Sequence, residues 1–227
     1  AGWAKILARG TGILAIHHAI AAWPAWDGYA RMLGGRFLYR GASLCGQLRQ
    51  DSGYCPDVRY TAATVPHAVT ACVADRFELD DELYAMELLE EEGLDPLLIR
   101  VTDIDPARFL SAQNAVRREQ GAPWSPPDEG RMIGWAKMAD ASRVVYLQPG
   151  DGPQTFAHPE YRKLIANALG VPPPLMLELG KRHNVPVAAL VGTRDHALAQ
   201  VRAGVDILVV AGGEAGGHCG EVATMVL

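Results

Sequence analysis

Short apolar runs and helix-like spacings alternate in the first part of the chain. Residues 13–16 form an apolar run of the kind found in buried parallel strands, and it places His17 and His18 at its C-terminal end. Over residues 23–33 the apolar positions recur with helical spacing, and the pattern stops at Gly34. A strand, a polar tip and a helix in this order predict a βα unit of an open parallel sheet.

The remaining pattern divides the chain near residue 169. Before this point we predict strands at residues 58–65, 97–101, 132–138 and 143–147 and a helix at 159–169. After it, the proline run at 172–174 is followed by a helix to residue 183, a strand at 185–191, a helix at 193–203 and a strand at 206–210. Such a regular run with short connections is typical of a (β/α)₈ barrel or a doubly wound sheet. We therefore expect two domains, residues 1–169 and 170–227.

Composition narrows the classes of function. The 227 residues are 49% hydrophobic and 21% charged, with a net charge of −5, which is ordinary for a globular protein. Without a basic stripe the chain is not expected to bind nucleic acid. No apolar run approaches the roughly 20 residues that span a bilayer, so no membrane partner is expected. The N-terminus does not resemble a secretory signal, and we expect a cytoplasmic protein with reduced cysteines.

Two polar segments have candidate chemistry. Residues 78–92 contain eight acidic side chains and no basic one, which we interpret as a solvated face rather than a cation site; no metal site is predicted. Residues 214–220 read EAGGHCG shortly after the apolar run at 206–210. Glycines let backbone N–H groups approach an anion, and a histidine suits proton abstraction. His218 is therefore a candidate catalytic base or else a loop residue that only packs.

The end of the chain resembles the nitronate monooxygenase (2-nitropropane dioxygenase-like) family. The resemblance rests on GVPPP at 170–174, VAALVGT at 187–193 and the glycine–histidine loop. It implies part of an FMN-dependent TIM barrel that oxidises alkyl nitronates with molecular oxygen. Gly216, Gly217 and Gly220 would bind the FMN, and His218 would act as the catalytic residue. The opening strands of that barrel and its later phosphate loops have no counterpart here, so we expect a partial barrel.

Residues 1–169 resemble a different family, the trehalose-utilisation (ThuA-like) proteins. The matching segments are GTGILAIHH at 10–18, DDELY at 80–84, IGWAK at 133–137 and RVVYLQPGDGP at 143–153. The resemblance implies a class I glutamine-amidotransferase-like (flavodoxin-like) parallel sheet, matched only after its first βα units and therefore incomplete. It also implies a link to the utilisation of trehalose or another disaccharide, by an enzyme or a sugar-binding module.

Four residues of this part are candidate substrate-binding groups. His17 and His18 lie where a strand meets a helix, the edge at which open α/β sheets bind ligands. Amidotransfer is not supported, because no cysteine nucleophile stands at that position. Trp23 belongs either to a sugar-stacking surface or to the core. Asp151, in a glycine-flanked loop, could accept hydrogen bonds from sugar hydroxyls or merely face solvent.

Three interpretations of the whole chain remain open. It could be a composite whose C-terminal part derives from an FMN-dependent oxidoreductase acting on a nitronate. It could be a ThuA-like protein acting on or binding a disaccharide. It could also be an inactive fusion of two partial reading frames, since no flexible linker separates the two parts. Incomplete sheets would leave uncovered edges, so self-association is expected.

Overall fold

The computed structural model describes residues 2–89, 92–118, 124–126, 130–169, 174–184, 187–191 and 194–210. The chain forms two compact units, residues 1–163 and 164–227, which are described separately. This division falls six residues before the end of helix α5 (Pro159–Leu169). The two domains expected from the sequence stay a prediction.

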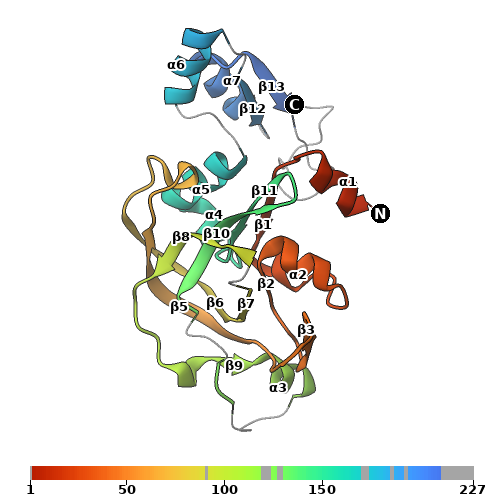
Figure 1. Cartoon of the computed structure of the whole chain (residues 1–227). Helices are drawn as coiled ribbons and strands as arrows, with labels where there is room; N and C mark the ends of the chain where they lie inside the picture. The colour runs from red at the N-terminus through yellow and green to blue at the C-terminus, as the bar shows by residue number, and fades with distance from the viewer. Residues whose placement is uncertain are drawn as a thin grey trace. The chain divides into compact units, whose positions relative to one another are not determined.

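The first unit is an α/β structure with a large central sheet (Figure 1). Its helices before α5 are α1 (Gly2–Ala8), α2 (Asp27–Leu33), α3 (Ala112–Arg117) and α4 (Pro153–Ala157), with 3-10 turns η1 (His17–Ala21), η2 (Ala68–Thr70) and η4 (Pro106–Arg108). Its strands are β1 (Ile13–Ile16), β2 (Gly35–Arg36), β3 (Ala42–Leu44), β4 (Gln47–Arg49), β5 (Gly53–Thr64), β6 (Arg76–Ala85), β7 (Glu87–Leu88), β8 (Asp95–Arg100), β9 (Leu110–Ser111), β10 (Met132–Ala139) and β11 (Ser142–Leu147).

Seven strands form one mixed sheet in the order β1-β11-β10-β8-β5-β6, with β9 also paired to β5. The prediction of a parallel sheet is correct only for the β1–β11 pair; the other described pairs of this sheet are antiparallel. The reason for antiparallel pairing is clearest at β10 and β11, where Ala139 pairs with Ser142. Two connecting residues suffice for an antiparallel hairpin, whereas a parallel pair needs a crossover of a dozen or more residues.

The sheet curls, so that its two outer strands meet in space. β1 and β6 stand at opposite ends of the strand order. Nevertheless His17, at the end of β1, lies 2.8 Å from the hydroxyl of Tyr84 on β6. The side chain of Gln148, just after β11, also accepts a hydrogen bond from the Tyr84 backbone N–H at 3.1 Å. The curled sheet therefore brings together residues that are more than 60 positions apart in the sequence.

Helix α2 packs on β10 and β11 and ends where its sequence requires it to end. Gly34 has a positive φ of 84°, and a Cβ there would stand 2.3 Å from the Leu94 side chain. Only glycine fits such a helix end without strain. Below the helix Trp135 is fully buried, and its indole N–H donates to the Leu33 carbonyl at 2.7 Å. This core fixes the strands that hold the residues of the site.

The second unit contains α6 (Pro174–His183), β12 (Ala188–Val191), α7 (Arg194–Ala203) and β13 (Ile207–Val210). The two strands pair in parallel, from Ala188 opposite Ile207 to Val191 opposite Val210. Helix, strand, helix and strand occur in the predicted order. The partial TIM barrel stays a prediction, because two parallel strands are common to several α/β folds.

The described helices include no candidate membrane-spanning segment. None of these helices is both long and apolar enough to cross a bilayer.

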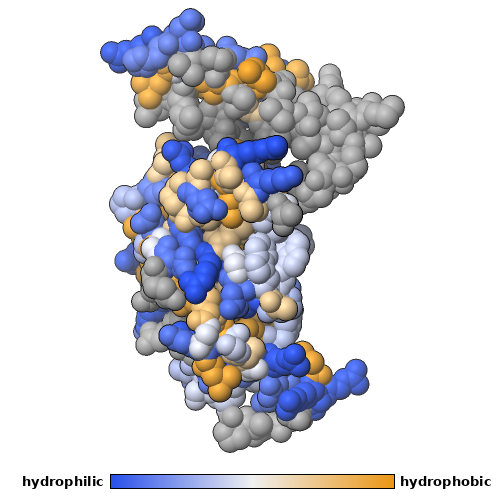
Figure 2. Space-filling model, turned by 45° about the vertical axis from the view of Figure 1, so that its right-hand side comes forward, coloured by the Kyte–Doolittle hydropathy of each residue, from blue (hydrophilic) through white to orange (hydrophobic). Residues whose placement is uncertain are grey.

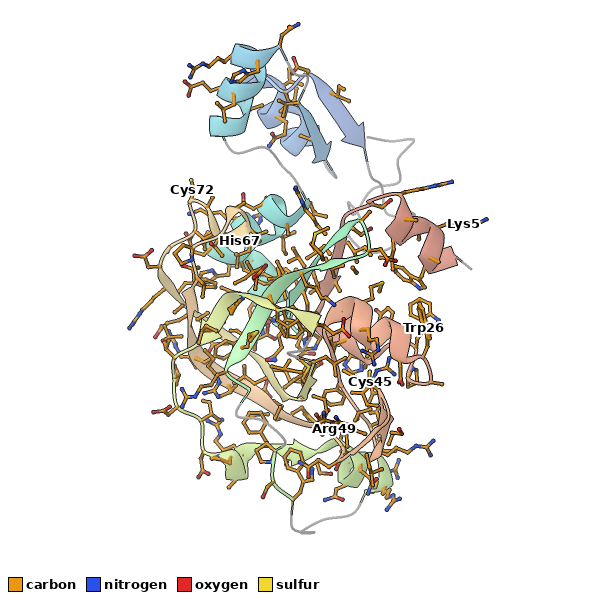
Figure 3. All side chains as sticks on the ribbon, in the orientation of Figure 1. Lys5, Trp26, Cys45, Arg49, His67 and Cys72 are labelled. Atoms are coloured by element: carbon orange, nitrogen blue, oxygen red, sulfur yellow. The ribbon has the colours of Figure 1, made fainter. Side chains whose placement is uncertain are left out.

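Hydrophilic and hydrophobic side chains are interspersed over the face of the first unit seen in Figure 2. Cys55 is a buried free thiol and Cys72 an exposed one, the latter labelled in Figure 3.

Candidate functional site at the seam of the curled sheet

His17 is held in a fixed orientation at the end of β1. Its backbone has a positive φ of 49°, which is uncommon for a residue other than glycine. The Tyr146 hydroxyl donates to the His17 carbonyl at 3.0 Å, and the His17 Nδ1 lies 2.9 Å from the Gln148 carbonyl. A carbonyl can only accept, so we assign the proton to Nδ1. The lone pair of Nε2 therefore faces the opposite side.

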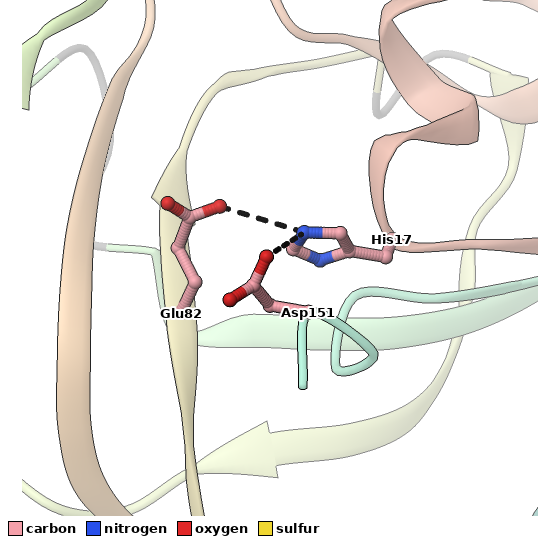
Figure 4. A group of neighbouring side chains, drawn as sticks. All are labelled: His17, Glu82 and Asp151. Atoms are coloured by element: carbon pink, nitrogen blue, oxygen red, sulfur yellow. Dashed lines mark ion pairs between the residues drawn. The ribbon is translucent and has the colours of Figure 1, made fainter. Parts of the chain in front are cut away.

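Two carboxylates converge on this nitrogen (Figure 4). Nε2 lies 3.5 Å from Glu82 Oε2 and 3.6 Å from Asp151 Oδ1. One ligand atom from each of the three side chains falls within 4.8 Å of the others. The side chains of His17 and Glu82 are 11% and 18% exposed, whereas that of Asp151 is 60% exposed. The group is thus open to solvent on the Asp151 side.

Asp81 anchors the backbone that carries both carboxylates. Its Oδ1 accepts from the N–H groups of Glu82 at 2.9 Å and Asp151 at 3.0 Å. Its Oδ2 accepts from the Gly150 N–H at 2.6 Å and the Thr155 hydroxyl at 2.8 Å. Asp81 is only 2% exposed. One buried carboxylate with four donors therefore fixes the 150–155 loop against β6.

The alternation of β6 explains why these neighbours have different roles. Successive side chains of a strand point to opposite faces, so Glu82 and Tyr84 share a face and Asp81 does not. Opposite them, β5 has a register shift between Cys55 and Val58. A bulge of this kind re-aims side chains and is frequent beside functional sites.

Aromatic rings surround His17 on its buried side. The Tyr84 ring stacks on the imidazole with centroids 4.8 Å apart, and Phe37 lies 4.8 Å from Tyr84. The Tyr84 hydroxyl is also 2.9 Å from His18 Nδ1, and His18 Nε2 is hydrogen-bonded to the Tyr39 hydroxyl. Tyr39 is 43% exposed, so one aromatic ring next to the site is accessible.

The charges and the burial of the site shift three pKa values. Burial lowers the pKa of His17, but the nearby carboxylate of Glu82, the hydrogen bond to the Gln148 carbonyl and the charge of Asp81 outweigh it, so that pKa is raised. Burial and the neighbouring His17 lower the pKa of His18. Burial, followed by the charge of Glu82, raises the pKa of Tyr84 and keeps its hydroxyl protonated.

The arrangement offers hydrogen-bonding and coordinating groups at one point. Two carboxylates accept from hydroxyl groups, and the imidazole nitrogen adds a further acceptor. The same three atoms could instead hold a cation, since imidazole and carboxylate are common metal ligands. Both uses require the carboxylates to remain fixed in place, which Asp81 ensures.

The structure brings together three of the four residues that we predicted as substrate-binding groups of this part. His17, His18 and Asp151 lie in one cluster. Trp23 is 52% exposed and packs beside Trp3 at 5.6 Å and Tyr29 at 5.0 Å instead. The roles of all four stay predictions.

Gly216, Gly217, His218 and Gly220, with the FMN they were expected to bind, lie outside the described residues.

Sequence reasoning missed the residues contributed by β6. The acidic run at 78–92 was interpreted as a solvated face, which is wrong for Asp81 and Glu87 because both are buried. A strand over residues 76–85, which we did not predict from the sequence, would have placed Glu82 and Tyr84 on one face. Their proximity to His17 leaves no local signal, because it depends on the curl of the sheet.

A family model and a curated relative match the sequence. The sequence model of the family described as "ThuA: Trehalose utilisation" matches residues 1–170, which confirms the resemblance predicted for residues 1–169. A curated Mycobacterium tuberculosis protein, "Putative monooxygenase Rv1533", is 58% identical over 72 residues, which are 32% of this chain and 19% of that protein. The chain thus spans less than a fifth of the length of this relative.

Two solved structures are similar to the chain, both described as a "Putative thua-like protein". That from Parabacteroides merdae has a TM-score of 0.50 and 15% identity, covering 73% of this chain and 61% of that one. That from Bacteroides uniformis has a TM-score of 0.48 and 17% identity, covering 74% and 60%. At such low identity the first likeness concerns the fold alone, and the chain spans about three fifths of each structure.

Proposed function

Since the chain belongs to the trehalose-utilisation (ThuA) family, we propose that it binds a disaccharide or a related small carbohydrate at the cluster of His17, Glu82 and Asp151. The observation that carries this proposal is the convergence of the carboxylates of Glu82 and Asp151, at 3.5 and 3.6 Å from His17 Nε2, at the C-terminal end of β1. Sites for small molecules combine a few placed polar groups with an apolar wall.

The groups around the cluster suit the two kinds of surface of a sugar ring. Hydroxyl groups donate to carboxylates, and Asp151 is exposed enough to meet a ligand from solvent. The apolar face of a pyranose packs on an aromatic ring, and the exposed Tyr39 next to His18 offers one. This supports carbohydrate binding by an enzyme or by a binding module, and product analysis separates these two.

Isothermal titration calorimetry of the full chain with trehalose, maltose and glucose tests the proposal. We expect a disaccharide to bind, and Asp151→Asn and Tyr39→Ala to weaken its affinity at least tenfold. Trp23→Ala is the informative comparison, because Trp23 is equally aromatic and exposed but packs elsewhere. Loss of binding in Trp23→Ala alone would move the site away from His17. Absence of binding by every sugar would refute the proposal.

A second candidate function concerns residues 170–227. The 58% identity to a protein named as a monooxygenase supports descent of part of the chain from an FMN-dependent nitronate monooxygenase-type oxidoreductase. In that case the purified chain would retain a flavin absorbance spectrum after incubation with FMN, and His218→Ala would change its turnover of a nitronate. A chain that takes up neither flavin nor sugar would fit the inactive fusion instead.

A further inference from the structure

We propose that His17, Glu82 and Asp151 bind one divalent first-row transition-metal ion. This differs from the expectation of no metal site drawn from the sequence. It concerns the ion alone and does not depend on whether the ligand of the chain is a sugar.

The donor set is suited to such an ion. It combines one imidazole nitrogen with two carboxylate oxygens, a mixture that Mn²⁺, Fe²⁺, Co²⁺ and Zn²⁺ accept. With three protein ligands, an ion here would keep open positions for water or a substrate oxygen. Those positions would face the Asp151 side, where the cluster meets solvent.

The distances from His17 Nε2 to the two carboxylate oxygens fit a shared ion better than they fit direct hydrogen bonds. At 3.5 and 3.6 Å from Nε2, the carboxylate oxygens are too far for good hydrogen bonds. Two ligands on one ion with bonds of about 2.1 Å are themselves roughly 3–3.5 Å apart. Both carboxylate oxygens therefore lie at nearly the coordination spacing from Nε2, and the three atoms lie within 4.8 Å of one another. Small side-chain rotations would complete the coordination geometry.

The surroundings fix the ligands in the manner usual for metal sites. A metal-binding histidine generally donates its other ring N–H to a carbonyl or carboxylate, and His17 Nδ1 does so to Gln148 at 2.9 Å. Asp81 Oδ1 accepts from the backbone N–H of both Glu82 and Asp151. One buried group thus sets the positions of both carboxylate ligands.

One contact competes with the ion for the imidazole. The Tyr84 hydroxyl is 2.8 Å from His17 Nε2 and occupies its lone pair when it donates there. The same hydroxyl is 2.9 Å from His18 Nδ1, which is a second acceptor. Turning the Tyr84 proton toward His18 would leave Nε2 available to the ion and keep the buried hydroxyl satisfied.

Electron paramagnetic resonance of Mn²⁺ tests this proposal without any sugar present. The full chain is freed of metal with a chelator and titrated with Mn²⁺, whose six-line signal falls when the ion binds. We expect one Mn²⁺ per chain and its displacement by Zn²⁺, because Zn²⁺ binds such ligands more tightly. Glu82→Gln and Asp151→Asn should each weaken Mn²⁺ binding at least tenfold.

The controls separate this site from adventitious binding. His183 lies exposed on α6 and Asp80 exposed on β6, so His183→Ala and Asp80→Asn should bind Mn²⁺ like the wild type. Asp151 is exposed, and its variant should fold even if Glu82→Gln does not; circular dichroism checks both. Failure of the wild type to bind Mn²⁺, or unchanged binding in Asp151→Asn, would overturn the proposal.

Discussion

Replacing Asp81 with asparagine should destabilise the first unit and loosen its site. Each oxygen of this buried carboxylate accepts two hydrogen bonds. Oδ1 accepts from two backbone N–H groups, and Oδ2 accepts from one backbone N–H and the Thr155 hydroxyl. An asparagine keeps one oxygen and places an NH₂ group against the two remaining donors. Two hydrogen bonds to a charged group are then lost at a buried position.

The expected magnitude follows from these two bonds. A hydrogen bond to a charged group contributes roughly 1.5–3 kcal/mol, so the free energy of unfolding should fall by roughly 3–6 kcal/mol. For a unit of this size each 1 kcal/mol lowers Tm by about 2–4 °C, which gives a drop of at least roughly 6 °C. Urea unfolding followed by tryptophan fluorescence measures the free energy of unfolding. Thermal unfolding followed by circular dichroism measures Tm.

The neighbouring residue supplies the control for this experiment. Asp80 has the same side chain but is exposed on the other face of β6. Asp80→Asn should change the free energy of unfolding by no more than about 0.5 kcal/mol. The reasoning would be refuted if the two variants were equally stable. Where Asp81→Asn remains folded, it should also bind Mn²⁺ more weakly, because both carboxylate ligands lose their shared anchor.

Three further predictions concern the fold around the site. Gly130→Ala should lower the free energy of unfolding by about 1–2 kcal/mol, because φ is +60° and the new Cβ would lie 2.6 Å from the Tyr84 carbonyl oxygen; an unchanged urea midpoint would contradict this. Burial raises the pKa of Glu92, but hydrogen bonds to Arg31 and Lys137 outweigh it and lower that pKa below 4.5. Its stabilisation is therefore full above pH 4.5 and lost as the pH falls through the folded-state pKa, so wild type and Glu92→Gln should differ at neutral pH and converge in acid; a difference independent of pH would show the sign to be wrong. Self-association through sheet edges should appear in light scattering as a mass that rises with concentration, and a monomer at every concentration would argue against it.

Local sequence patterns predicted the elements that carry His17. The apolar run at 13–16 is β1, the helical spacing at 23–33 contains α2, and the strands expected at 132–138 and 143–147 are β10 and β11. These features depend on periodicity and on glycine at a helix end, both of which are visible in a single sequence. The family resemblance of residues 1–169 also came from motifs along these segments.

The pairing of the strands could not be predicted in the same way. A short apolar run occurs in both parallel and antiparallel sheets, so the sequences of β8, β10 and β11 did not indicate the direction in which these strands pair. The short connection between the strands predicted at 132–138 and 143–147, residues 139–142, was the available signal for a hairpin. The parallel sheet was inferred instead from the family resemblance and from the first βα unit.

The sequence indicated His17 and Asp151 but not Glu82, because Glu82 comes from a strand that is distant from both in the sequence. His17 and Asp151 stood out as polar residues at strand ends or in glycine-flanked loops. Glu82 lay within an acidic run whose charge suggested solvent exposure, and along β6 it shares a face with the exposed Glu78 and Asp80. Its position beside His17 follows from the meeting of β1 and β6, a tertiary feature that no local pattern encodes.

An anomalous difference map at the manganese absorption edge, from crystals grown with Mn²⁺, tests the central claim of one shared site most directly. The account predicts a single peak bonded to His17 Nε2, Glu82 Oε2 and Asp151 Oδ1, at about 2.0–2.3 Å from each. A map with no peak between these three atoms, or with its strongest peak at other side chains, would contradict it.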